Sequence, residues 1–180
     1  IRFIDKNITL VKENILNINN INIKLDQHTK NGLIWNTKDY GKLFCYNLNY
    51  FDFLNQINSN TYIDYNQKLI KKWIAVNKNF KNIEYESYVI SLRLVNWIIY
   101  LLKNNNSDVV ILNSILQQAN LLSKKIEYNI QANHLIKNAK CLIFVGIFFN
   151  NNISEKFYKI GINLFNDEID KQILKDGAHY

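Results

Sequence analysis

Apolar residues recur at every third or fourth position through most of the chain from Tyr46 onward, which is the spacing of one face of an α-helix. Polar residues fill the positions between them, and the breaks between periodic stretches are short. Helices joined by such short connections pack as antiparallel neighbours. The pattern therefore predicts an all-α array of helical hairpins, with helices over residues 46–57, 62–76, 87–102, 109–130, 131–149 and 155–174.

Two residues at helix starts and one turn at a helix end support these boundaries. Asp108 and Ser154 precede apolar-periodic stretches, and both residue types are good N-caps. The sequence "KDG" at residues 175–177 is a stop signal. The hairpins share no fixed repeat, so a closed or partly closed ring of unlike helices is as good a prediction as a solenoid. In a ring, the helix ends surround a central cleft.

The first part of the chain has a different pattern. "IRFIDKNITL" alternates weakly, as a strand does, and the following "NILNINNINIKL" is too rich in Asn to assign. We therefore expect an N-terminal lead with little regular structure over residues 1–42, followed by a helical domain over residues 43–180.

Composition narrows the class of protein. A content of 48% hydrophobic and 13% aromatic residues in 180 residues predicts a packed core rather than a disordered tail. The chain begins with Ile and ends in a turn signal, which predicts an internal fragment. The formal net charge of +7 comes from scattered lysines, which is typical of a solvated surface or of an anionic partner. Among anionic partners an acidic polysaccharide fits better than nucleic acid, because no nucleic-acid-binding motif is present.

Cysteine usage and the apolar runs exclude other classes. Cys45 and Cys141 lie in apolar surroundings without metal-ligand spacing, so we expect small core residues and neither a disulfide framework nor a metal site. The longest clean apolar run, residues 141–149, is shorter than the roughly 20 residues that a membrane span needs. No membrane span is predicted.

An Asn-His pair marks the start of the most apolar predicted helix. The amide of Asn133 can donate hydrogen bonds, and His134 can donate when protonated or act as a base when neutral. The free N–H groups at a helix start also favour anions. The alternative is structural: Asn133 caps the helix and His134 packs against a neighbouring loop. The pattern alone leaves both interpretations open.

Four ordered stretches carry a family resemblance. They are "LFCYNLNYFDFL" (residues 43–54), "YVISLRLVNWI" (88–98), "IEYNIQANHLIKNAKCLIFVGIFF" (126–149) and "QILKDGAHY" (172–180). Together they resemble the N-terminal helical region of heparinase II/III-like polysaccharide lyases. The third stretch, with the fourth at the expected distance behind it, is the most specific.

The resemblance implies a fold and a setting. Such lyases pair an incomplete α/α toroid with an antiparallel β-sandwich, so residues 43–180 would be part of the toroid and the sandwich would lie beyond Tyr180. It also implies an anionic polysaccharide substrate, no cofactor, and a periplasmic or secreted bacterial protein. The oligomeric state is not indicated.

The resemblance also assigns chemistry. The family cleaves uronate linkages by β-elimination, in which a carboxylate is neutralised before the neighbouring carbon loses its proton. Asn133 matches the position that neutralises the carboxylate, and His134 matches the adjacent residue that assists it or takes the proton. His179 matches the histidine of the family's "DGxH" turn. The family's catalytic Tyr is expected downstream of Tyr180, so we predict that this chain alone is inactive.

Further substrate-binding candidates lie in the first two stretches. Arg93 could pair bidentately with a uronate, or it could form a structural ion pair with a carboxylate such as Glu84 or Glu86. Trp97 is predicted to be a core anchor. The remaining candidates offer polar groups or flat faces for a sugar, although aromatic residues at helical spacing are often core residues. They are Asn96, Tyr46, Asn47, Tyr50 and Trp35.

One departure from the family pattern bears on function. Relatives usually carry His where this chain has Asn49, which puts in doubt any contact that the missing His makes. Two alternatives to a lyase therefore stay open: a non-catalytic carbohydrate-binding domain, and a helical scaffold that binds protein. The scaffold hypothesis predicts that Asn133 and His134 point into packed helix ends.

Overall fold

The computed structural model describes residues 8–18, 21–25, 28–29, 32–33, 35, 40–128 and 133–172. Within these ranges the fold is mostly helical, as predicted. Short 3₁₀ helices cover Asp52–Asn55, Ser59–Tyr62 and Ile83–Tyr85. The α-helices are α1 (Lys42–Tyr50), α2 (Ile63–Val76), α3 (Ser87–Lys103), α4 (Val109–Lys124), α5 (Asn133–Phe149) and α6 (Asn152–Gln172).

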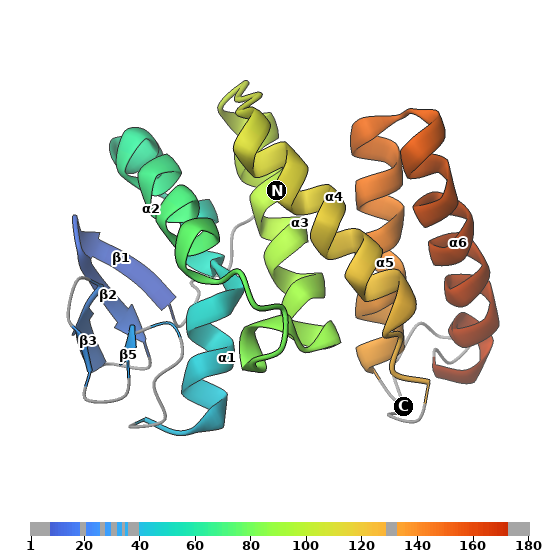
Figure 1. Ribbon diagram of the computed structural model, residues 1–180, viewed down its shortest axis with the longest axis horizontal. Coiled ribbons are helices and arrows are strands. Elements are labelled where there is room, and N and C mark those ends of the chain that lie inside the picture. Colours follow the sequence, from blue (N-terminus) through green and yellow to red (C-terminus); the bar gives the residue numbers. More distant parts are fainter. Residues whose placement is uncertain are drawn as a thin grey trace.

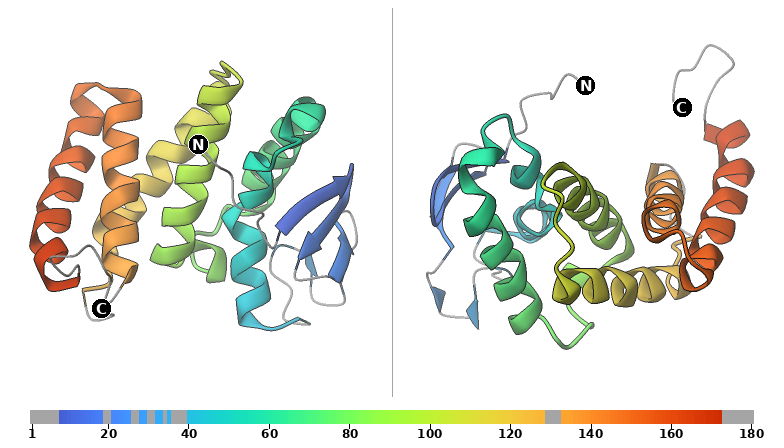
Figure 2. Two further views of the ribbon diagram at one scale, coloured as in Figure 1. Left: turned by 180° about the vertical axis from the view of Figure 1, so that it is seen from behind. Right: turned by 90° about the horizontal axis from the view of Figure 1, so that it is seen from above.

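The helices follow one another along an arc (Figure 1). Seen from above, α1, α3 and α5 lie in a row, α2 and α4 lie along one side of that row, and α6 flanks its end (Figure 2). Two helices of this row, α3 and α5, point the same way. Tyr88 and Ser91 of α3 contact His134 and Asn138 of α5 in the same order, so α3 and α5 run parallel. The first turns of these two helices therefore meet at the same end of the row.

Backbone geometry sets two helix boundaries that periodicity did not predict. The helix expected over residues 46–57 ends at Tyr50, because Phe51 adopts a left-handed conformation with φ of 59°. The 3₁₀ helix Asp52–Asn55 follows it. The helix expected over residues 109–130 ends at Lys124, and residues 125–128 lead out of it as a loop.

One predicted cap is confirmed and another is corrected. The Asp108 carboxylate accepts hydrogen bonds from the N–H groups of Val110 and Ile111, at 3.0 and 3.3 Å. Helix α6 starts before Ser154, and Asn151 caps it by accepting from the N–H of Ser154 at 3.0 Å. The Ser154 hydroxyl accepts from the Asn151 N–H in return, so it completes a reciprocal cap rather than being the cap.

Two glycines allow α5 and α6 to pack closely. A Cβ on Gly146 would lie 2.5 Å from the Cβ of Tyr158, and a Cβ on Gly161 would lie 2.9 Å from the carbonyl oxygen of Ala139. These distances are shorter than real Cβ atoms allow. The absence of a side chain at both positions therefore brings the two backbones together.

The N-terminal segment is more regular than predicted. Strands β1 (Ile8–Lys12), β2 (Ile15–Ile18) and β3 (Ile21–Lys24) form an antiparallel sheet in the order β1-β2-β3, and β4 (His28–Thr29) pairs with β5 (Gly32–Leu33). The Gln56 side chain binds β1 through both the N–H and the carbonyl oxygen of Leu10, at 2.6 and 3.1 Å. The sheet is thereby fixed against the 3₁₀ helix that follows α1.

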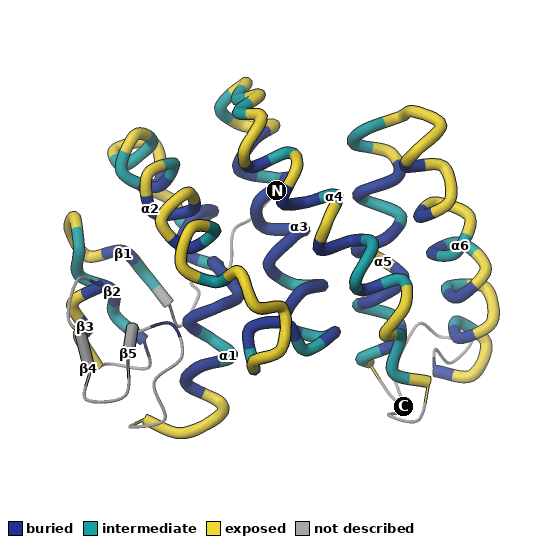
Figure 3. Tube along the Cα trace, in the orientation of Figure 1, coloured by how far each residue is buried: buried dark blue, intermediate teal, exposed yellow. Residues whose placement is uncertain are grey.

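One core joins the sheet to the helices. Leu16 and Ile18 of β2 belong to the same buried cluster as Trp97 of α3, which confirms Trp97 as a core anchor. Cys45 and Cys141 are buried, which confirms their prediction as small core residues. Burial is heaviest along α3, in the middle of the row, and lightest on the outer side of α6 (Figure 3). None of the described helices combines the length and apolar character that crossing a bilayer demands.

Candidate active site

The first turn of α5 carries the Asn-His pair. Asn133 is the first residue of the helix and is exposed, and His134 is half-buried. Within the described part of the chain, the Asn133 side chain makes no hydrogen bond. A helix start presents unpaired backbone N–H groups and a partial positive charge. The two side chains therefore stand where an anionic group is favoured, and they are not sealed among packed helix ends.

His134 is held on two sides. Its Nδ1 lies 3.3 Å from the Oε2 atom of Glu127, and its ring packs against Tyr88 in a tilted arrangement, with ring centroids 4.3 Å apart and planes at 31°. The His134 side chain is 31% exposed and that of Glu127 is 22% exposed. A carboxylate only accepts hydrogen bonds, so this contact favours a proton on Nδ1 and leaves Nε2 for a ligand.

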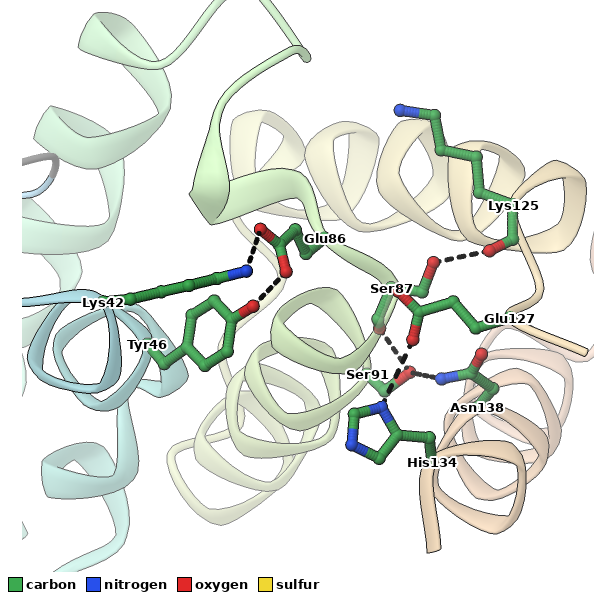
Figure 4. Close-up of polar contacts among 9 residues, drawn as sticks. All are labelled: Lys42, Tyr46, Glu86, Ser87, Ser91, Lys125, Glu127, His134 and Asn138. Carbon is green, nitrogen blue, oxygen red and sulfur yellow. Dashed lines mark hydrogen bonds and ion pairs between the residues drawn. The ribbon is translucent and has the colours of Figure 1, made fainter. Parts of the chain in front are cut away.

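The loop that carries Glu127 is anchored to α3 (Figure 4). The Ser87 hydroxyl donates to the carbonyl oxygen of Lys125 at 2.5 Å, and the Ser91 hydroxyl donates to the carbonyl oxygen of Ser87 at 2.8 Å. The Asn138 amide in turn donates to the Ser91 hydroxyl at 2.9 Å. This chain of bonds connects the loop before α5 to the first two turns of α3 and to the second turn of α5.

A row of tyrosine rings continues from His134 toward α1. Tyr88 meets Tyr50 edge-on at 6.1 Å between centroids, and Tyr50 meets Tyr46 at 6.4 Å. Burial raises the pKa of Tyr50 far above its ordinary value, and burial together with Asp52 raises the pKa of Tyr88. These phenols therefore stay protonated at neutral pH and can act as hydrogen-bond donors.

Tyr46 ends the row in a polar cluster. Its hydroxyl donates to Glu86, and Lys42 pairs with the same carboxylate at 3.1 Å (Figure 4). Burial, and then the bond to Glu86, raises the pKa of Tyr46. Asn47 is half-buried on the next position of α1. His179 lies outside the described residues.

Arg93 does not face an open cleft, contrary to the substrate-binding prediction. Its side chain has no exposed surface, and its Nε and Nη2 atoms donate to Oε1 of Gln118 at 2.9 and 2.6 Å. The guanidinium lies 4.2 Å from the ring centroid of Trp73. Burial lowers the pKa of Arg93 to about 10, so it stays charged at neutral pH. The predicted ion pair with a glutamate is therefore not what holds Arg93 among the described residues, because its hydrogen bonds go to Gln118 and to the carbonyl oxygen of Asn49.

Asn96 and Asn49 are also buried. Asn96 donates to the carbonyl oxygen of Tyr50 at 2.9 Å and to the Asp52 carboxylate at 2.6 Å, and it is 7% exposed. Asn49 donates to the carbonyl oxygens of Trp35 and Cys45, both at 2.8 Å, and accepts from the indole N–H of Trp73 at 2.7 Å. The residue that replaces the family's usual His therefore serves the core.

A comparison with known protein families identifies the family of this chain. Residues 46–180, more than half of the chain, match the family model described as Heparinase II/III N-terminus. The chain belongs to the heparinase II/III N-terminus family. The resemblance carried by the four sequence stretches is thereby confirmed, and the chain is related to polysaccharide lyases. No curated protein and no solved structure gave a match.

In this member of the heparinase II/III N-terminus family, the predicted site residues fall into two groups that differ in burial. Asn133 is exposed and His134, Tyr46 and Asn47 are half-buried. The other candidates, Tyr50, Arg93, Asn96 and Trp35, are buried, so the substrate-binding prediction for Tyr50 is corrected as well. The ring of Phe51 stacks on one face of Trp35, with ring centroids 5.2 Å apart. The predicted sugar-stacking role of Trp35 is therefore wrong.

Two residues of the site were not predicted. Tyr88 and Glu127 contact His134 directly, from α3 and from the loop before α5. A signal existed for Tyr88, because it lies in the first turn of one predicted helix as His134 does in another. Nothing in the sequence marked Glu127. Across the described ranges, no cluster of three or more His, Cys, Asp or Glu side chains is arranged to hold a metal ion.

Proposed function

We propose that this chain supplies the carboxylate-binding part of a polysaccharide lyase active site, which cleaves a uronate-containing polymer by β-elimination. Family membership supports the reaction class. The observation that carries the proposal is the first turn of α5, where Asn133 is exposed and His134 presents one ring nitrogen beside a row of tyrosines.

The proposed role of Asn133 is to neutralise the substrate carboxylate. β-Elimination removes the proton from the carbon next to the carboxylate, forms a carbon-carbon double bond and breaks the bond to the glycosidic oxygen. The intermediate resembles an enolate, in which the carboxylate oxygens carry more negative charge than they do in the substrate. Donors fixed around those oxygens therefore stabilise the transition state more than the substrate. The amide of Asn133 and the N–H groups of the helix start are such donors.

The proposed role of His134 depends on Glu127. With the proton on Nδ1, the neutral ring has a lone pair on Nε2 that can accept the substrate proton. When the ring is protonated, Nε2 donates to the carboxylate instead. The glycosidic oxygen takes its proton from a tyrosine that the family resemblance places downstream of Tyr180. The phenol of Tyr88, which is half-buried, contributes a hydrogen bond to a sugar hydroxyl.

The setting follows from the substrate. Uronate polymers are extracellular or capsular materials, so we place the protein in the periplasm or outside the cell. A mildly basic chain, with a net charge of +7, also favours approach of a polyanion.

The test uses the full-length gene product, incubated with uronate homopolymers and with alternating uronate–hexosamine polymers. Elimination creates an unsaturated uronate, so ultraviolet absorbance should rise on at least one polymer. Asn133→Ala should lower kcat/KM by about 10²- to 10³-fold, because one transition-state donor is lost. Its thermal unfolding should match wild type, since the side chain is exposed.

A folded wild-type protein that gives no absorbance rise on any polymer would remove the lyase proposal. If that protein still binds a uronate polymer, the non-catalytic carbohydrate-binding alternative replaces it. If it neither cleaves nor binds, the helical scaffold alternative remains.

A further inference from the structure

A cavity of about 210 Å³ lies between α3 and α5. Leu92, Val95 and Ile99 of α3 give it an apolar side. Lys137 and Lys140 of α5 line it from the facing helix. Lys137 is half-buried and Lys140 is exposed, and the Lys140 ammonium lies 5.5 Å from the ring centroid of Phe144.

The cavity continues the surface of the proposed active site. Asn133, Lys137 and Lys140 are four and three positions apart, and residues at this spacing share one face of a helix. Lys137 and Lys140 lie about 4.5 and 9 Å beyond His134 along the axis, at 1.5 Å per residue. On α3, the contact of Tyr88 with His134 comes one turn before the cavity. A polymer held at the first turn of α5 would meet the cavity next.

The lining suits a sugar better than a small inorganic anion. Besides the two lysines, Asp52 and Asn96 line the cavity, and the Asn96 amide donates to the Asp52 carboxylate at 2.6 Å. A carboxylate repels a bare anion but accepts hydrogen bonds from sugar hydroxyls. An apolar side matches the C–H face of a pyranose ring, and the two ammonium groups favour an acidic substituent.

We propose that this cavity is a second sugar subsite, which binds an acidic sugar residue next to the one held by Asn133 and His134. The inference rests on the proposed function and names its substrate class: a polymer with acidic groups on neighbouring residues. The shared chemistry is an anionic group on a pyranose, either a carboxylate or a sulfate.

The test measures binding of fluorescent oligosaccharides to the 180-residue chain at low and moderate salt. The probes are a uronate homo-oligomer and alternating uronate–hexosamine oligomers with and without sulfate. The Lys137→Gln/Lys140→Gln double variant should weaken binding of the homo-oligomer about five- to tenfold at low salt, and less at moderate salt. It should leave binding of the unsulfated alternating oligomer unchanged.

The matched control is Lys156→Gln/Lys159→Gln on α6, which removes the same charge from residues that do not line this cavity. It should bind as wild type does. A double Lys137/Lys140 variant that behaves like this control, while Asn133→Ala loses binding, would overturn the subsite and leave the proposed function intact. A wild-type chain that binds none of the probes would overturn both. If the Lys137/Lys140 double variant binds both the homo-oligomer and the sulfated oligomer more weakly, the subsite accepts either a carboxylate or a sulfate. If only the homo-oligomer binds more weakly, the subsite takes a carboxylate.

Discussion

Two polar regions of this chain, one around Arg93 and one at the first turn of α5, are both candidate sites in the sequence, but they differ in burial in the structure. Around Arg93, an arginine, an asparagine and a glutamine on different helices satisfy one another inside the core, with Arg93 and Asn49 fully buried. At the first turn of α5, an asparagine and a histidine remain open to solvent on one side. A buried polar group must be paired to be tolerated, so the first region is committed to stability. The second has capacity left for a ligand.

The largest effect should come from breaking the closed region. Arg93→Met removes two hydrogen bonds to Gln118 and the contact with Trp73, which should lower the free energy of unfolding by about 3 kcal/mol or more. Thermal or denaturant unfolding measures the change, with exposed Lys159→Gln as the control. The variant that remains folded should still bind a uronate oligomer. Normal stability with lost binding would make Arg93 a substrate residue after all.

A second helix start sharpens the comparison, because its polar residue is structural. Asp108 caps α4 and pairs with Lys71 at 2.5 Å. Burial alone would raise its pKa, but hydrogen bonds from Lys71, Ile111 and Gln67 outweigh burial and lower the pKa. Asp108→Ala should cost about 1 kcal/mol of stability at neutral pH.

The sign of the pH dependence follows from the lowered pKa. A carboxyl group whose pKa is lower in the folded state stabilises the protein at pH values above its unfolded-state pKa, near 3.9. This stabilisation is lost as the pH falls through the folded-state pKa. The difference between wild type and Asp108→Ala should therefore shrink in acid, below about pH 4. Asp108→Asn is the control that retains a capping oxygen. A difference that grows in acid would contradict the assignment.

The smallest effect on stability should come from the open region. Glu127→Ala removes a partly exposed contact and should change the free energy of unfolding by less than about 0.5 kcal/mol. Its effect should appear in the tautomer of His134, because the carboxylate that favours a proton on Nδ1 is gone. Long-range ¹H–¹⁵N spectra distinguish the tautomers, and the chain has 3 histidines, which simplifies assignment. A wild-type His134 with its proton on Nε2 would reject the positioning role.

Periodicity predicted the helices well because each buries a continuous apolar stripe. It failed where tertiary packing decides the backbone. A phenylalanine with positive φ is unfavourable locally, and Phe51 adopts it where its ring packs among Trp35, Trp73 and Trp97. The N-terminal strands were missed because asparagines interrupt their alternation, and the Gln56 side chain that binds β1 is 46 residues from Leu10.

The candidate site was predictable only in part. The Asn-His pair stands out in the sequence by its place at a helix start, and its role in a site stays a prediction. Arg93 could not be assigned from sequence, because its partner Gln118 lies 25 residues away on another helix. Glu127 was equally hidden, since only the fold of the loop before α5 brings its carboxylate to His134.

The most direct measurement is an NMR titration of the chain with a uronate oligosaccharide, which observes both regions in one experiment. The side-chain amide of Asn133 and the imidazole of His134 should shift as the ligand is added, and the Nε–H of Arg93 should not. The chain has only two arginines, Arg2 and Arg93, so that signal can be assigned. Unchanged signals from Asn133 and His134 at saturating ligand, or a response confined to the Arg93 region, would contradict the account.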